Sequence, residues 1–166
     1  MHVEKLTPEQ WLALSGYAHQ AVFGKQKDPF AERITYAWLV VEGDKPVSYI
    51  TVLELDSDTA YWQFGGAFPW AWNSRAVTKS YDLCIQAQEK LSKRFATRIE
   101  NTNTPMLKLA LSRGFLPVGL RTYQGTILLE LVRESNHAVS SDSAGNHGRH
   151  DAALAVAAEP AERERP

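Results

Sequence analysis

The stretch IENTNTPMLKLALSRGFLPVG, residues 99–119, decides the fold. Pro105 suits the first turn of a helix, and we expect this helix to run to Arg113. Gly114 follows at the position where a residue able to adopt the left-handed conformation closes the last helical turn. Phe115 comes next and is expected to enter the core before a new strand begins. The stretch therefore predicts a strand, a capped helix and a second strand in direct succession.

The elements on either side of this stretch follow from periodicity and turn residues. A capping box begins a helix at Thr7 that ends near Gly24, and a short second helix is expected from Asp28 to Arg33. Three antiparallel strands are predicted over residues 34–42, 47–55 and 60–68, a long helix over 74–95, a short strand over 96–101, and a terminal β pair over 118–124 and 126–132. The order α-α-β-β-β-α-β-α-β-β indicates an α+β fold with a mixed, mainly antiparallel sheet.

The composition of the chain changes near residue 133. All 17 aromatic residues lie at or before Tyr123, and the last 33 residues contain no Phe, Trp, Tyr, Ile or Met. Such a segment buries too little apolar surface to offset its ordering entropy. We expect one domain over residues 1–133 and a low-complexity, disordered tail over 134–166. Within the tail, only residues 151–159 favour a short helix, and its histidines lack regular metal-ligand spacing.

Charge and cysteine content exclude several classes of function. The formal net charge of −1 argues against bulk electrostatic binding to nucleic acid. Cys84 is the only cysteine, so an intramolecular disulfide and a Cys-rich metal site are excluded, and no metal is expected. No apolar run is long enough to span a bilayer, and the start lacks the apolar core of a secretory signal, so we expect a cytoplasmic protein. Ser-His-Asp sets, a Walker loop and a dinucleotide fingerprint are also absent from the sequence.

A characteristic spacing separates four residues of the stretch quoted above, which are Asn103, Met106, Gly114 and Phe115. With the order of elements, this spacing resembles the GNAT superfamily of acyl-CoA-dependent N-acetyltransferases, over roughly residues 3–132. The resemblance implies that the third strand splays away from the strand after the long helix. It also implies that acetyl-CoA, or another acyl-CoA, binds as co-substrate in the resulting V-shaped cleft.

The resemblance implies a cofactor site built mainly from backbone groups. Pantetheine would bind the third strand at Gly66, Ala67 and Phe68, in a stretch where Gly65 and Gly66 predict a bulge or a close approach. The pyrophosphate would lie at the start of the long helix. The residues implied there are Ser74, Arg75, Ala76, Thr78 and Lys79, and Asn103 and Met106 complete the set. Thr78 replaces a small glycine, so Arg75 and Lys79 either compensate by binding phosphate or are solvated helix residues.

The catalytic groups depart from the family pattern. Ala110 stands where the family often has a Tyr that protonates the leaving thiolate. Tyr123 is the alternative phenol, although it could also be a core or surface residue. Glu54 and Glu100 are the candidates for a general base, and each could instead be a solvent-facing charge. Gln63 stands where related enzymes often carry Glu, and an amide cannot take up a proton.

Trp70 and Trp72 lie between the third strand and the long helix. In an extended segment they would share one side and could stack a planar acceptor such as a nucleobase, or pack under the sheet edge. Three functions therefore remain open: an N-acyltransferase acting on a small or macromolecular amine, a GNAT-like module without catalysis, and a nucleic-acid base-modifying enzyme. The resemblance also implies that the terminal β pair can mediate a homodimer.

Overall fold

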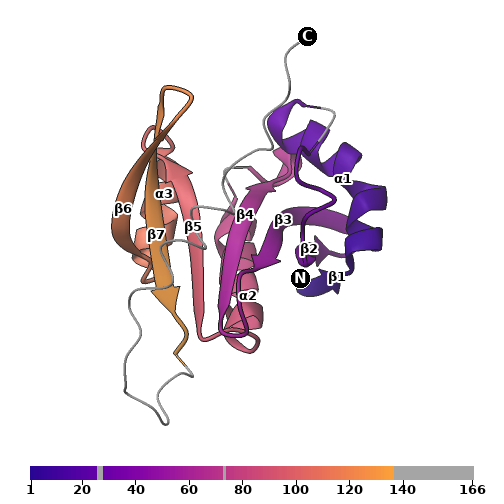
Figure 1. The fold of residues 1–166 in the computed structure, drawn as a ribbon. Helices are drawn as coiled ribbons and strands as arrows, with labels where there is room; N and C mark the ends of the chain where they lie inside the picture. Colours follow the sequence, from indigo (N-terminus) through magenta and orange to yellow (C-terminus); the bar gives the residue numbers. More distant parts are fainter. Residues whose placement is uncertain (26–27, 73, 137–166) are drawn as a thin grey trace.

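A seven-stranded sheet in the order β1-β2-β3-β4-β5-β7-β6 organises the computed structural model, which describes residues 1–25, 28–72 and 74–136 (Figure 1). The strands are β1 His2–Leu6, β2 Tyr36–Glu42, β3 Lys45–Glu54, β4 Thr59–Ala67, β5 Arg94–Glu100, β6 Leu116–Tyr123 and β7 Thr126–Glu134. The helices are α1 Pro8–Phe23, α2 Arg75–Glu89, α3 Thr104–Ser112 and the single-turn 3-10 helix η1 Pro69–Ala71. β4 and β5 pair in parallel and all other neighbouring strands are antiparallel, so the predicted mixed α+β fold is confirmed.

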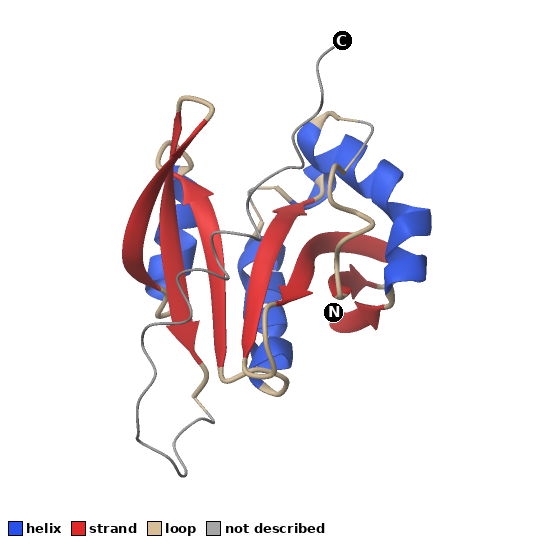
Figure 2. Ribbon diagram, viewed as in Figure 1, coloured by secondary structure: helices blue, strands red, loops and turns tan. Residues whose placement is uncertain are grey.

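Helices cover both faces of the sheet (Figure 2). On one face, Trp11 and Ala18 of α1 pack with Tyr49 and Phe68. On the other face, α2 and α3 enclose the larger core, in which the rings of Trp62, Phe95 and Phe115 contact one another. The sheet therefore separates two apolar layers, and α1 lies opposite α2 and α3.

A buried amide lies at the centre of the larger core. Gln88 of α2 is fully buried, and its Oε1 accepts hydrogen bonds from the indole N–H groups of Trp38 and Trp62, each at 3.0 Å. Its Nε2 donates to the hydroxyls of Tyr36 and Ser92. One side chain thus supplies hydrogen bonds to strands β2 and β4 that the apolar core cannot provide.

The predicted capping residues of α1 and α3 are confirmed. Thr7 and Gln10 form the reciprocal capping box before α1, and Gly24 ends that helix in the left-handed conformation. Gly114 has a φ of 80° after α3, and Phe115 is buried as expected. These local signals need no tertiary information, which is why the sequence alone predicts them.

Three elements differ from the expectation. β1 was not predicted, and it pairs antiparallel with β2 although it has only five residues. The predicted helix from Asp28 to Arg33 is wrong, because these residues form successive turns in which the Asp28 carboxylate accepts the Phe30 N–H at 2.9 Å. The long helix ends at Glu89 rather than near residue 95, and β5 begins at Arg94.

The last strand runs slightly further than expected. β7 ends at Glu134, and the Ser135 N–H donates to the Lys93 carbonyl at 2.7 Å. Residues 137–166, which hold most of the predicted tail with its histidines and its short helix, lie outside the described residues. Within the described part of the chain, no helix is long and apolar enough to cross a membrane.

Candidate functional site

β4 and β5 separate after a short parallel ladder. They pair from Thr59 with Arg94 up to Trp62 with Thr97, and the Thr97 hydroxyl donates to the Trp62 carbonyl at 3.0 Å where the pairing ends. Beyond this point β4 continues to Ala67 without pairing to β5, and Figure 1 shows the two strands diverging. We call this diverging region the fork. The splay that the resemblance implied is therefore present.

A bulge in β4 lies at the start of the fork. Trp62 pairs with Val52 and Phe64 pairs with Thr51, so Gln63 is an extra residue in the β4 strand. The Gln63 side-chain Oε1 is buried and has no hydrogen-bond partner among the described residues. Because a bulge resets the alternation of a strand, the groups that face the fork depend on this one residue.

The bulge decides which backbone groups of β4 face the fork. The Phe64 N–H does not face the fork, because it donates to the Thr51 hydroxyl on β3 at 3.0 Å. The Phe68 N–H likewise donates to the Val47 carbonyl of β3 at 2.9 Å. Backbone groups alternate along a strand, so those of Gly65 and Ala67 point to the other side, into the fork. Of the predicted pantetheine contacts, only Ala67 faces the fork, whereas Gly66 and Phe68 face β3.

A side chain of α1 fills the space beside the Gly66 Cα. A Cβ atom on Gly66 would lie 2.3 Å from Cγ1 of Val22, a residue of α1. The close approach that the glycine pair predicted is therefore the packing of α1 against β4. Gly65 also lacks room on its own side, because a Cβ there would meet the Tyr49 carbonyl oxygen at 2.9 Å.

Trp70 and Trp72 do not share one face. The segment that holds them is not extended, since residues 69–71 form η1. The Trp72 indole N–H donates to the Ala67 carbonyl at 2.8 Å, whereas the Trp70 indole N–H donates to the Pro46 carbonyl at 2.8 Å. The Trp70 ring stacks on Phe68 with a centroid distance of 4.8 Å. The two tryptophans are therefore separate features, and the paired stacking platform is not formed.

The start of α2 has its own cap. The Ser74 hydroxyl accepts the Ala76 N–H at 3.2 Å and donates to the Ala71 carbonyl. Arg75, Thr78 and Lys79 are exposed on the first turns of the helix. Neither cation forms an ion pair within the part of the chain that the structure describes. This end of α2 thus combines a helix dipole with two available positive charges.

Asn103 acts first as a helix cap. Its Oδ1 accepts the Met106 N–H at 3.3 Å at the start of α3. Met106 is half-buried and packs against the larger core. Ala110 is fully buried at the position of the family's usual Tyr. Asn103, Met106 and Ala110 therefore serve mainly to cap α3 and to pack it against the core.

The predicted acid and base candidates lie at different ends of the sheet. Glu54 pairs with Ala60, seven residues or about 23 Å along β4 from Ala67, so the structure does not bring it to the fork. It lines a pocket of about 280 Å³ with Lys5 and Tyr36 instead. Glu100 ends β5 at the open end of the fork and is exposed.

Tyr123 also lies at the open end of the sheet. It is the last residue of β6 and is half-buried beside the turn to β7. Its partner in β7 is Thr126, two residues before Leu128, which pairs with Glu100. The two strand pairs thus bring Tyr123 and Glu100 to the same end of the sheet.

Sequence reasoning missed a cluster of charges beside the fork. Arg98, the first β5 residue after the paired region, donates to the Glu130 carboxylate at 2.8 Å. Arg121 lies 3.4 Å from the same carboxylate oxygen, and the Tyr61 ring lies 5.7 Å from the Arg98 guanidinium. Glu130 is therefore an ion-paired residue of this face. Only the pairing of β5 with β7 could have revealed it.

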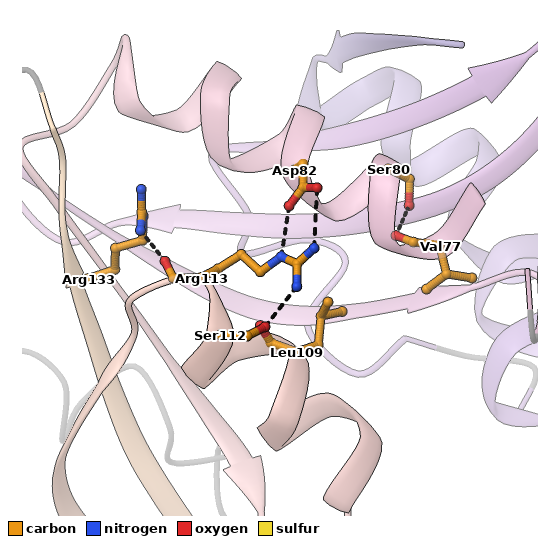
Figure 3. Close-up of polar contacts among 7 residues, drawn as sticks. All are labelled: Val77, Ser80, Asp82, Leu109, Ser112, Arg113 and Arg133. Atoms are coloured by element: carbon orange, nitrogen blue, oxygen red, sulfur yellow. Dashed lines mark hydrogen bonds and ion pairs between the residues drawn. The ribbon is translucent and has the colours of Figure 1, made fainter. Parts of the chain in front are cut away.

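The two halves of the sheet are connected behind the fork (Figure 3). The Arg113 guanidinium after α3 donates to both carboxylate oxygens of Asp82 on α2, at 2.9 and 3.3 Å. It also donates to the Ser112 hydroxyl, while Arg133 of β7 donates to the Arg113 carbonyl. These contacts connect α2, which packs on β1, β2 and β3, to the end of α3 and to β7.

Cys84 is not a nucleophile in this site. It is fully buried in the larger core, and burial raises the pKa of its thiol to about 12. Burial also raises the pKa of the Tyr81 hydroxyl, which has no hydrogen-bond partner among the described residues. Neither group carries a charge near neutral pH, so both are structural.

Comparison with solved structures relates this geometry to known proteins. The chain is similar to the ribosomal-protein-S18-alanine N-acetyltransferase from Escherichia coli, with a TM-score of 0.66 and 15% identity over 87% of this chain and 96% of that one. It has the GNAT fold. Arabidopsis thaliana Naa50, in complex with the bisubstrate analogue CoA-Ac-MVNAL, matches with a TM-score of 0.64 and 11% identity over 81% of this chain and 99% of that one.

A third GNAT-fold structure contains the cofactor itself. A GNAT family acetyltransferase from Elizabethkingia anophelis with acetyl-CoA bound matches with a TM-score of 0.60 and 14% identity, over 80% of this chain and 96% of that one. No protein-family model matches the sequence, and no curated protein matches it either. At these identities the likeness establishes the GNAT fold, and the activity has to be argued from the site.

Proposed function

We propose that the chain is an acyl-CoA-dependent N-acyltransferase, with acetyl as the expected acyl group, in which an amine attacks the thioester directly in a ternary complex. The fork carries this proposal, because β4 and β5 stop pairing after Trp62 and Thr97 and leave strand groups available to a ligand. Acetyl-CoA bound to one GNAT-fold neighbour and a CoA-derived bisubstrate analogue bound to another support the choice of cofactor.

The residues around the fork fit this co-substrate. Pantetheine contains two amides, which are suited to hydrogen bonds with the backbone groups of Gly65 and Ala67. The first turn of α2 and the exposed Arg75 and Lys79 suit the pyrophosphate, because helix N-termini and cations both favour anions. Acetyl-CoA would supply the activated thioester carbonyl, and the rest of the reaction concerns the amine and its protons.

Glu100 and Tyr123 are the residues that we assign to proton transfer. A protonated amine has to lose a proton before it is nucleophilic, and a carboxylate at the open end of β5 can accept it directly or through a water. Tyr123, with its hydroxyl on the neighbouring hairpin, is the candidate donor to the leaving thiolate. Holding amine and thioester together supplies much of the remaining acceleration. Glu54 is not included because it lies at the paired end of β4 and β5.

Calorimetric titration with acetyl-CoA tests the proposal. We expect saturable binding that weakens about threefold to tenfold in Arg75→Ala and in Lys79→Ala, since each removes one contact to phosphate. Lys90→Ala is the matched control, because Lys90 is exposed and caps the opposite end of the same helix. Absence of binding at about 1 mM acetyl-CoA, a concentration at which even weak cofactor sites fill, would refute the proposal.

A second function, a GNAT-fold binding module without catalysis, is favoured by a specific observation. Ala110 is buried at the usual Tyr position, and Gln63 is an amide at the start of the fork, so two familiar groups for proton transfer are missing. Incubation with acetyl-CoA and a panel of amines distinguishes the two functions. Release of free CoA thiol above the rate without protein supports the transferase, and binding without release supports the module.

A further inference from the structure

The Trp72 side chain forms a hydrogen bond inside the fork. Its indole N–H donates to the Ala67 carbonyl oxygen at 2.8 Å. That carbonyl is on the side of β4 that faces the fork, because the neighbouring Phe68 N–H is directed to Val47 of β3. An intramolecular donor thus already uses one of the strand groups suited to pantetheine.

We propose that Trp72 competes with acyl-CoA for the Ala67 carbonyl, so that the indole leaves this carbonyl when the pantetheine amide binds. This inference rests on the proposed function, because it concerns the same cofactor site. A peptide-like amide N–H and an indole N–H are both neutral donors of similar strength. The protein therefore loses one internal hydrogen bond for each one that pantetheine gains at Ala67, and the affinity for the cofactor is lowered accordingly.

The local structure indicates a low free-energy cost for releasing the Trp72 indole from the Ala67 carbonyl. Trp72 is 54% exposed, and no aromatic ring of the described residues stacks on it. It follows the single turn of η1 and has an extended backbone, with φ of −58° and ψ of 148°, so its side chain is not held within a helix. Rotation of the indole away from Ala67 breaks one hydrogen bond of a residue that is already more than half exposed.

Trp70 provides a matched control two residues away. Its indole N–H also donates to a backbone carbonyl at 2.8 Å, and it is 48% exposed. The acceptor, however, is Pro46 at the start of β3, which lies outside the fork. Replacing either tryptophan by phenylalanine removes an equivalent hydrogen bond and keeps an aromatic ring, and only the Trp72 change uncovers a group that faces the fork.

Calorimetric titration of acetyl-CoA into the full chain, the Trp72→Phe variant and the Trp70→Phe variant tests the competition. We expect the Kd to fall about threefold to tenfold in Trp72→Phe, the range for removal of one competing neutral hydrogen bond, and to stay unchanged in Trp70→Phe. An unchanged or raised Kd in Trp72→Phe overturns the inference, since the carbonyl would then accept both donors or the indole would itself contact the cofactor.

An equal fall of the Kd in both variants also overturns the inference, because it would indicate a general loosening of the segment. If none of the three proteins binds acetyl-CoA, the proposed function fails and the inference fails with it. Binding without a difference between the variants refutes the inference alone.

Nuclear magnetic resonance gives a second measurement that does not depend on activity. The chain has five tryptophans, and the indole N–H signal of Trp72 is the one missing from the Trp72→Phe spectrum. On addition of acetyl-CoA we expect this signal to shift and its exchange with water to accelerate, while the signal of Trp70 stays in place. A Trp72 signal that remains unchanged at saturation contradicts displacement of the indole.

Discussion

Replacement of Gly66 by alanine tests how α1 packs against the fork. The added Cβ would lie 2.3 Å from Cγ1 of Val22, a distance at which one of the two residues has to move. The next nearest atom, Cβ of Val22, lies 3.7 Å away, which is an ordinary van der Waals contact. The clash therefore depends on one methyl group, and Val22→Ala removes it.

The magnitude follows from this geometry. Overpacking lowers the free energy of unfolding by about 1–3 kcal/mol. The reduced conformational freedom of the unfolded chain raises it by about 0.4–1 kcal/mol. Gly66→Ala should therefore lower the free energy of unfolding by about 1–2 kcal/mol. Val22→Ala alone should lose about 0.8 kcal/mol, because its two methyl groups are half-buried. In the double variant the clash is absent, and the loss should be at least about 1 kcal/mol smaller than the sum of the two single losses.

Urea unfolding followed by tryptophan fluorescence measures these differences. Single losses that add up in the double variant would refute the packing of Val22 against Gly66. The same proteins test the assignment of Gly66 to the β3 side, since the double variant should bind acetyl-CoA with the Kd of the unaltered protein. A large loss of affinity for acetyl-CoA in a stable double variant would instead indicate that Gly66 contacts the cofactor.

The remaining predictions concern stability, reactivity and catalysis. Gln88→Leu should destabilise the fold by about 3 kcal/mol or more in urea unfolding, because two buried indole N–H groups lose their acceptor. Burial lowers the pKa of His19 below its unfolded value of 6.5, so its contribution to stability is complete above that pH and is lost as the pH falls below it. Unfolding at about pH 7.5 and about pH 5.5 should therefore show a smaller difference in His19→Gln than in the unaltered protein. Cys84, with a pKa raised to about 12, should resist iodoacetamide in the folded protein and react on unfolding, as mass spectrometry would show; rapid native alkylation would contradict its burial. Glu100→Gln should lower kcat by about 10²-fold or more with little change in the Kd for acetyl-CoA, whereas Glu54→Gln should leave both unchanged; the reverse pattern would move the base to the paired end of the sheet.

The parts of the fold that the sequence predicts depend on local chemistry. The capping box at Thr7, the left-handed Gly114 and the turn at Gly125 each require only neighbouring residues. β1 was missed because five residues with two charged side chains give too little periodicity, and its stability comes from pairing with β2. Asp28 looked like a helix start, but its carboxylate serves a turn and also accepts the Trp11 indole N–H at 3.4 Å.

The candidate site was predictable in outline and less so in its contacts. The fork was implied by the resemblance, whereas the backbone groups that face it depend on the bulge at Gln63, which no local signal indicates. Trp72 was noticed from its residue type, but its bond to Ala67 requires the turn of η1. The ion pair of Glu130 was not predictable, because its partner Arg98 is 32 residues away in the chain.

The short ladder between β4 and β5 has a mechanical consequence. Among the described residues, four pairs form this ladder, so a change of the angle between the half-sheets strains few backbone hydrogen bonds. Such a change is also opposed by the packing of Trp62 against Phe95 and Phe115, by the ion pair of Arg113 with Asp82 and by the covalent crossover through α2. In the function that we propose, the size of amine that the fork admits is thus governed in part by side chains on the opposite face of the sheet, and variants that widen the acceptor range are best sought among them.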